Sequence, residues 1–72
     1  MNQTEIIQQL NDFFKNFKLP ENPIILSTGE TIIDVKKFLD VHLKFINNKE
    51  NQDGKLIEAY IDRLIKLTEN LK

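Results

Sequence analysis

The chain of 72 residues contains no cysteine, no tryptophan, one histidine and one arginine. Without cysteine it can form no disulfide and offers no thiolate ligand, and a single histidine argues against zinc sites and against Ser-His-Asp or Cys-His catalysis. The lack of cysteine also fits a reducing cytosol. We therefore expect a protein that binds no metal and carries no cofactor.

The sequence also lacks an excess of either charge and any long apolar run. The chain has ten basic and eleven acidic side chains, which gives a net charge of −1. DNA or RNA binding requires a clustered basic surface, so we expect no nucleic-acid partner. The longest apolar run is the three residues 24–26, and the polar N-terminus does not resemble a signal peptide. We expect a cytoplasmic protein with no membrane association.

The composition is that of one small globular domain spanning residues 1–72, with 40% hydrophobic and 29% charged residues. So short a chain buries only about 60% of the surface that its unfolded form exposes, so its stability as a monomer should be marginal. With no disulfide or metal to help, the expected remedies are very good helix packing or oligomerisation.

The first segment has helical periodicity. Asn2 followed by Glu5 predicts a capping box, with Thr4 as a competing cap, and the helix should end near Lys18 because the sequence continues with Leu-Pro. Its apolar stripe consists of Ile6, Ile7, Leu10, Phe13, Phe14 and Phe17.

Residues 19–33 should not be helical, because Pro20 and Pro23 each remove a backbone donor. Two short β-branched runs, 24–26 and 31–33, flank a turn in which Gly29 suits a positive φ. This pattern predicts either a small hairpin packed against the helices or an ordered loop whose isoleucines fill the core.

Two further helices complete the expected fold, which is mainly α: a three-helix domain with a short β-hairpin or extended loop between helices 1 and 2. Asp34 should cap the second helix, a polar loop covers 47–54, and the third helix should begin near Gly54 with Asp53 as its cap. The second helix has a buried stripe of Val35, Phe38, Leu39, His42, Phe45 and Ile46.

The third helix has an unusually wide apolar arc, so it is either central in the core or shared with a second subunit. We expect a homo-oligomer, with Tyr60, Leu64, Leu67 and Leu71 as candidate interface residues. The five phenylalanines have core spacing and no basic groove beside them, which favours the core over a base-stacking surface.

His42 and Arg63 are the polar residues of most interest. His42 lies on an apolar stripe, which favours a structural histidine bonded to a backbone carbonyl over a ligand-contacting or pH-sensing group. Arg63 either belongs to an exposed row of charges with Glu58, Asp62 and Lys66 or makes the bidentate contacts that lysine cannot.

Two other features carry weaker signals. The turn containing Thr28 and Gly29 either reverses the chain or forms a small backbone nest for an anion. The carboxylates available for acid–base catalysis have no evident apolar enclosure, and a fold of this size has little room for a cleft. These carboxylates are Glu30, Asp34, Asp40, Glu58 and Asp62. We expect a protein that is not an enzyme.

The sequence from residue 19 onward resembles a family of small uncharacterised proteins, a domain of unknown function, from Bacteroidetes bacteria and their phages. The residues that carry the resemblance are Leu19-Pro20, Pro23-Ile24, Leu26, Gly29, Ile32, Asp34, Phe38-Leu39, His42-Leu43, Tyr60, Asp62, Arg63 and Leu64. The resemblance implies no activity, but a phage context is compatible with small helical oligomers that bind host proteins or sequester nucleotide-derived signals. Its candidate ligand contacts are Thr28, Gly29, Lys37, His42 and Arg63.

Two functions follow as hypotheses. The first is a non-enzymatic protein-interaction module that self-associates through apolar helix faces. The second is a small oligomeric binder of an anionic, nucleotide-like ligand, held by Arg63, His42 and the backbone near Gly29.

Overall fold

The computed structural model describes residues 2–52 and 54–71, which form three helices and one two-stranded antiparallel hairpin. The hairpin lies between the first two helices, so the predicted fold class is confirmed, and of the two alternatives for this segment the hairpin is the one that forms. The elements are α1 (Gln3–Lys15), β1 (Ile24–Ile25), β2 (Thr31–Ile32), α2 (Val35–Asn47), the 3₁₀ helix η1 (Lys49–Asn51) and α3 (Lys55–Leu71).

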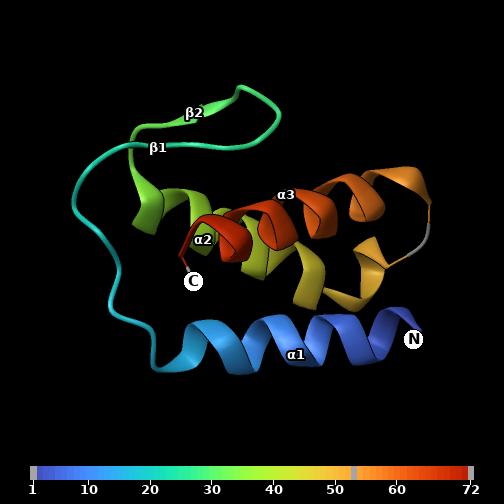
Figure 1. The fold of residues 1–72 in the computed structure, drawn as a ribbon. Helices are drawn as coiled ribbons and strands as arrows, with labels where there is room; N and C mark the ends of the chain where they lie inside the picture. The colour runs from blue at the N-terminus through green and yellow to red at the C-terminus, as the bar shows by residue number, and fades with distance from the viewer. Residues whose placement is uncertain (1, 53, 72) are drawn as a thin grey trace.

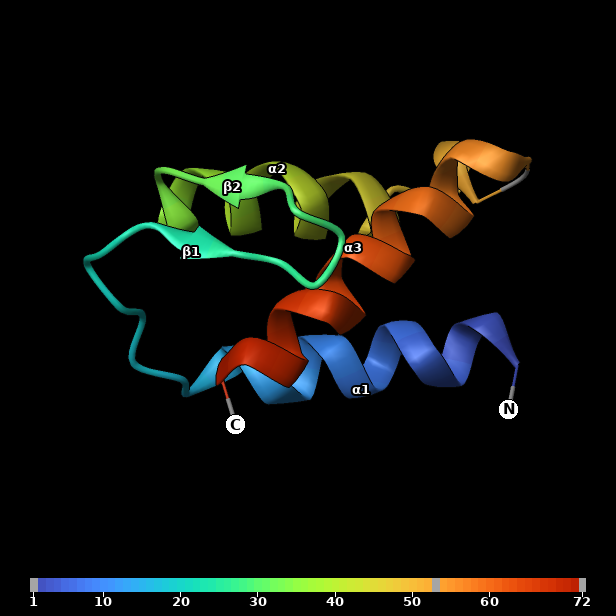
Figure 2. The same ribbon diagram turned by 45° about the horizontal axis from the view of Figure 1, so that its top comes forward.

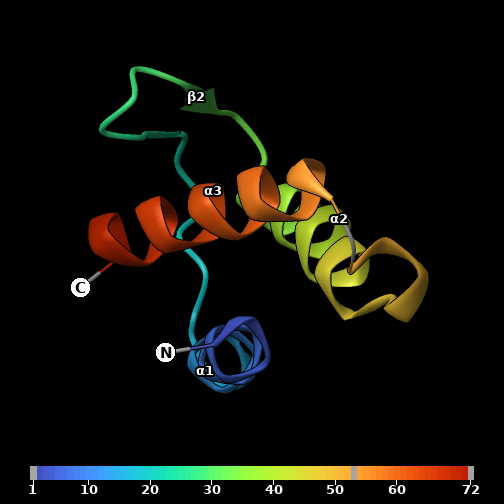
Figure 3. The same cartoon turned by 90° about the vertical axis from the view of Figure 1, so that its right-hand side faces the viewer.

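Helix α3 occupies the middle of the molecule. It packs against both α1 and α2, and the hairpin lies on the side of the α2–α3 pair away from α1 (Figure 1). Turning the molecule shows α1 at one side of α3 and the hairpin at the other (Figures 2 and 3). A helix with neighbours on several sides must be apolar on several sides, which explains the wide arc in its sequence.

Helices α1 and α2 begin as the sequence predicts. The Asn2 Oδ1 accepts a hydrogen bond from the Glu5 amide at 2.8 Å, and Asp34 Oδ1 accepts from the Lys37 amide at 3.0 Å. Thr4, the competing cap, lies inside α1. The predicted cap of the third helix, Asp53, lies outside the described residues.

Helix α1 ends at Lys15, three residues before the predicted end at Lys18. Asn16 leaves the helical region at φ −119° and ψ 13°, so the chain turns away before it reaches the prolines. The ring of Phe17 nevertheless stacks on Phe13, with centroids 5.1 Å apart. This contact keeps the first residues of the connection against the end of the helix.

The hairpin closes through the turn at Gly29, where φ is +91°. The Gly29 amide donates to the Leu26 carbonyl at 2.9 Å, and the Leu26 amide donates to the Glu30 carbonyl at 2.8 Å. Leu26 and Ile32 point inward and are almost fully buried. The hairpin therefore adds side chains to the core, which supplies the stability that two isolated strands lack.

The burial of α3 corrects the predicted oligomer interface. Leu64 and Leu67 are 0% exposed within one chain, so neither side chain is available to a second subunit. Tyr60 and Leu71 are only partly buried. The assignment of Leu64 and Leu67 to a subunit interface was therefore wrong, because the wide apolar arc serves the central position of α3.

The phenylalanines lie at the edge of the core and none is fully buried. Phe14, Phe38 and Phe45 pack against the buried cluster. Phe13 and Phe17 stack on each other and are not part of it. The prediction that all five form the core is therefore correct for three of them only.

Candidate functional site

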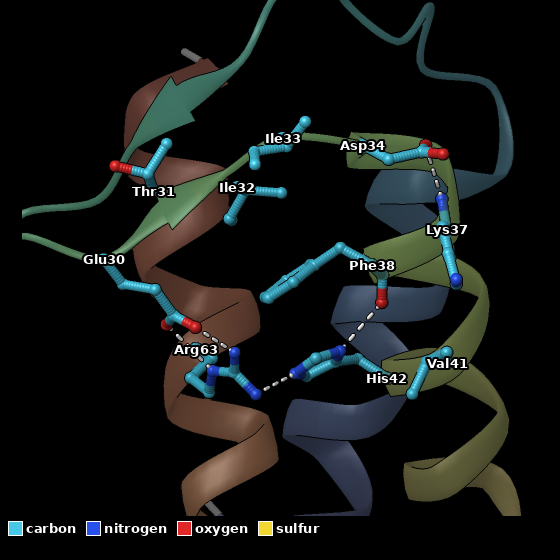
Figure 4. Close-up of a pocket in the computed structure, with 10 residues that line it drawn as sticks. All are labelled: Glu30, Thr31, Ile32, Ile33, Asp34, Lys37, Phe38, Val41, His42 and Arg63. Carbon is cyan, nitrogen blue, oxygen red and sulfur yellow. Dashed lines mark hydrogen bonds and ion pairs between the residues drawn. The ribbon is translucent and has the colours of Figure 1, made fainter.

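A chain of polar contacts joins the hairpin to α3 and α2. Glu30, at the end of the turn, forms an ion pair with Arg63 of α3, whose Nε donates to Glu30 Oε2 at 3.1 Å. The Arg63 Nη1 donates to Nε2 of His42 at 2.7 Å, and His42 lies on α2. These bonds link the hairpin and α2, which follow each other in the sequence, to α3, whose Arg63 is 33 residues from Glu30 and 21 from His42 (Figure 4).

His42 is held as one neutral tautomer by its two partners. Its Nδ1 lies 2.7 Å from the Phe38 carbonyl, which can only accept, so Nδ1 carries the hydrogen. The guanidinium of Arg63 can only donate, so Nε2 is the acceptor. The predicted bond between His42 and a backbone carbonyl is therefore confirmed.

Burial and charge shift the pKa values of this cluster. Burial lowers the pKa of His42 below its ordinary value of 6.5, and the nearby positive charge of Arg63 acts in the same direction. Hydrogen bonding from Arg63 lowers the pKa of Glu30 below its ordinary value of 4.5. At neutral pH the cluster thus contains a carboxylate, a guanidinium and a neutral imidazole.

Aromatic rings surround this cluster. The Phe38 ring stacks on the His42 ring with centroids 3.8 Å apart, and the Arg63 guanidinium carbon lies 4.9 Å from the centroid of Phe38. The ring centroids of Tyr60 and His42 are 4.6 Å apart. His42 is consequently 4% exposed, as little as the apolar core residues Ile32 and Leu39.

An open pocket of about 340 Å³ lies beside these residues, between β2 and α2. We call it the β2–α2 groove. Two of its apolar side chains are unusually exposed, Ile33 at 77% and Val41 at 49%. Its lining comprises residues 30–34, Lys37, Phe38, Val41, His42 and Arg63 (Figure 4).

The structure brings three of the predicted site residues together and leaves two apart. Lys37, His42 and Arg63 all line the β2–α2 groove. Thr28 and Gly29 lie in the exposed hairpin turn and are not part of its lining. The Gly29 amide is already bonded to Leu26, so this amide serves the turn rather than an anion.

Sequence reasoning missed Glu30 as the partner of Arg63, as well as the exposed apolar pair Ile33 and Val41. Two carboxylates on the same helix, Glu58 and Asp62, were the expected neighbours of Arg63, whereas Glu30 is 33 residues away. Strand alternation gave a usable signal for Ile33, since Ile32 and Ile33 cannot both face the core.

The groove offers little to a catalytic mechanism. The acceptor lone pair of His42 is occupied by Arg63, and the Glu30 carboxylate is held in an ion pair. Within residues 2–52 and 54–71, no three His, Cys, Asp or Glu side chains gather to hold a metal ion. Among the described residues, no helix has both the length and the apolar character needed to cross a membrane.

The chain belongs to the family described as "Domain of unknown function (DUF6965)", whose model matches residues 5–72. This confirms membership of an uncharacterised family. Neither the curated proteins nor the solved structures contain a match to this chain.

Proposed function

We propose that this protein is a non-catalytic protein-interaction module whose contact surface is the β2–α2 groove. The observation that supports this most strongly is the exposure of Ile33 and Val41 together at the groove. Exposed apolar side chains next to a concave surface are typical of protein contact sites. The aromatic ring of Phe38 and the side chain of Arg63 belong to residue types that are enriched at such sites.

The polar cluster provides a rigid floor for this surface. Glu30, Arg63 and His42 fix the hairpin against α2 and α3, so the exposed side chains are held in place before a partner arrives. A surface ordered in advance loses less conformational entropy when it binds. We therefore assign the cluster a positioning role.

The proposal includes self-association, but its contact surface is now the β2–α2 groove and not the apolar face of α3. The apolar face of α3 is used within one chain, so a second copy would bind at the β2–α2 groove instead. Native mass spectrometry of the purified protein tests this. A dimer that becomes a monomer on Val41→Glu supports self-association, whereas a monomer at all concentrations requires a different protein as the partner.

The main experiment compares proteins captured from cells of the source organism by three tagged forms. These are the unmodified protein, the double variant Ile33→Glu/Val41→Glu and the control Leu56→Glu. Leu56 is 58% exposed and does not line the groove, so it matches the size and exposure of the tested residues. The proposal requires that partners are lost from the double variant and kept by the control. Equal capture by all three forms contradicts it.

Binding of an anionic, nucleotide-like ligand is the second candidate, because Lys37, His42 and Arg63 line one pocket. The ion pair with Glu30 weakens this proposal, since an incoming anion must share or displace an existing carboxylate. A panel of nucleotides tested by thermal shift decides it. A rise in melting temperature that disappears in Arg63→Ala favours this function. If no nucleotide raises the melting temperature of the unmodified protein, the protein does not bind those nucleotides.

An origin in Bacteroidetes or their phages would suit either function, and it rests on the sequence resemblance alone. A small protein that binds a host component would need a contact surface of this kind and no catalytic residues.

A further inference from the structure

The pairing register of the hairpin determines which backbone groups of β2 face the groove. Ile24 pairs with Ile32 and Ile25 with Thr31, while the Leu26 amide donates to the Glu30 carbonyl. In an antiparallel pair, residues that exchange hydrogen bonds alternate with residues that do not. Residues 30 and 32 therefore bond to β1, and the amide and carbonyl groups of Thr31 and Ile33 point away from it.

These outward groups form an open strand edge. No hydrogen bond in the described chain uses the backbone of Ile33, which lies beyond the end of β2. Thr31 and Ile33 are both exposed, and both line the β2–α2 groove. No residue of β1 lines the groove, and Figure 4 shows β2 between β1 and the polar cluster. The open edge of β2 therefore borders the groove.

The two edges of the hairpin differ in how they are protected. On β1, the same register turns residue 23 outward, and Pro23 has no amide hydrogen to offer. Natural sheets commonly use proline to prevent unwanted pairing at an edge. The edge of β2 has no proline at Thr31 or Ile33, so both positions keep an outward amide.

The groove lining carries two acidic and two basic side chains, and one of the basic ones, Lys37, favours an acidic occupant. Glu30 and Arg63 neutralise each other, and Asp34 caps α2 by accepting from the Lys37 amide. The ammonium group of Lys37 forms no ion pair with any described residue. A carboxylate of a partner would give the Lys37 ammonium the ion-pair partner that it lacks among the described residues.

We propose that the β2–α2 groove binds an extended segment of a partner protein, which adds as a strand to the edge of β2 and places an acidic group near Lys37. Apolar side chains of the segment would pack on Ile33, Val41 and Phe38 while its backbone pairs with Thr31 and Ile33. This mode combines main-chain hydrogen bonds for affinity with side-chain contacts for specificity. It rests on the proposed function and specifies its partner.

The test begins with a phage-displayed library of random linear peptides selected on the purified protein. Enriched peptides should contain an acidic residue beside alternating apolar residues, and in an NMR titration they should shift the amide signals of Thr31 and Ile33. Ile33→Pro removes an outward amide that the β1–β2 ladder does not use, and Ile33→Val keeps that amide and a β-branched side chain. We expect Ile33→Pro to bind at least tenfold more weakly and Ile33→Val to bind within twofold of the unmodified protein.

A second measurement tests strand addition without changing the protein, in case Ile33→Pro disturbs the fold. N-methylation of the selected peptide, one residue at a time, should abolish binding at alternate positions only, because alternate amides of an added strand face β2. The Lys37→Met variant should weaken binding of the acidic peptide, and Lys36→Met, an exposed neighbour outside the groove lining, should not.

The outcomes separate this inference from the proposed function. Failure to enrich any peptide, equal binding by Ile33→Pro and Ile33→Val, or insensitivity to N-methylation overturns strand addition. If Val41→Glu abolishes binding while Ile33→Pro leaves it intact, the groove binds protein in another way. If the selected peptides match a segment of this chain's own sequence, the partner is a second copy of this protein. Strand addition then still stands.

Discussion

Replacing Arg63 with alanine should destabilise the fold more than its partial exposure suggests. The substitution leaves Nε2 of His42 without its donor, and His42 is only 4% exposed in the intact protein, so a largely buried acceptor loses its partner. An unsatisfied buried acceptor costs about 1–3 kcal/mol. This is the largest single contribution that Arg63 makes.

The other two contacts of Arg63 add less. Its position over the Phe38 ring is worth about 0.5–1 kcal/mol. Its ion pair with Glu30 is worth about 0–1 kcal/mol, because the two side chains are 35% and 37% exposed and water screens the attraction. The free energy of unfolding should fall by about 1.5–5 kcal/mol in Arg63→Ala, a large share of the stability of so small a domain.

Urea denaturation at neutral pH, followed by circular dichroism, measures this effect. Glu30→Gln serves as the comparison, because it removes the charge of the pair and leaves the Arg63–His42 bond, and it should cost less than about 1 kcal/mol. The double variant His42→Phe/Arg63→Met removes both partners, so it should be more stable than the sum of the single losses predicts. Equal costs for Arg63→Ala and Glu30→Gln, or additive losses in the double variant, would refute this reasoning.

Three further predictions concern pH, the turn and the core. Because the pKa values of His42 and Glu30 are lowered on folding, the unfolded chain binds more protons, so stability should fall as pH drops below about 6.5 and again below about 4.5. Urea titrations across this range should show that His42→Phe loses the first decrease. Gly29→Ala should lower the free energy of unfolding by about 1 kcal/mol, measured by thermal denaturation. The added methyl group meets open space, so the loss comes from the positive φ of +91°, which alanine rarely adopts. Leu64→Ala should lower the free energy of unfolding by about 2–5 kcal/mol, because this side chain is 0% exposed. Leu56→Ala should lower it by less than about 0.5 kcal/mol, because Leu56 is 58% exposed. Similar losses in the two variants would show that α3 is not central.

Local signals in the sequence were sufficient for most of the fold. Capping by Asn2 and Asp34 depends on hydrogen bonds within three residues, and both caps form as predicted. The positive φ of Gly29 is likewise a property of one turn. The end of α1 was harder to predict, because Asn16 leaves the helix before the prolines act on the backbone.

The candidate site depended on contacts that no local pattern encodes. His42 could be placed on a buried stripe from its helical spacing, and a bond to a backbone carbonyl was predicted, which the structure identifies as that of Phe38. The pairing of Arg63 with Glu30 required knowledge of how the hairpin packs on α3. The same lack of tertiary information made the arc of α3 suggest a subunit interface, although a central helix has the same pattern.

The measurement that tests the central claim most directly is site-specific photocrosslinking in cells of the source organism. A photoreactive amino acid replaces Val41 in one form and Leu56 in the other, because both side chains are exposed and only Val41 lines the groove. We predict a discrete crosslinked species from position 41, with doubled mass if the partner is a second copy, and none from position 56. Equal crosslinking from both positions, or crosslinking from position 56 alone, would contradict the assignment of the β2–α2 groove as the contact surface.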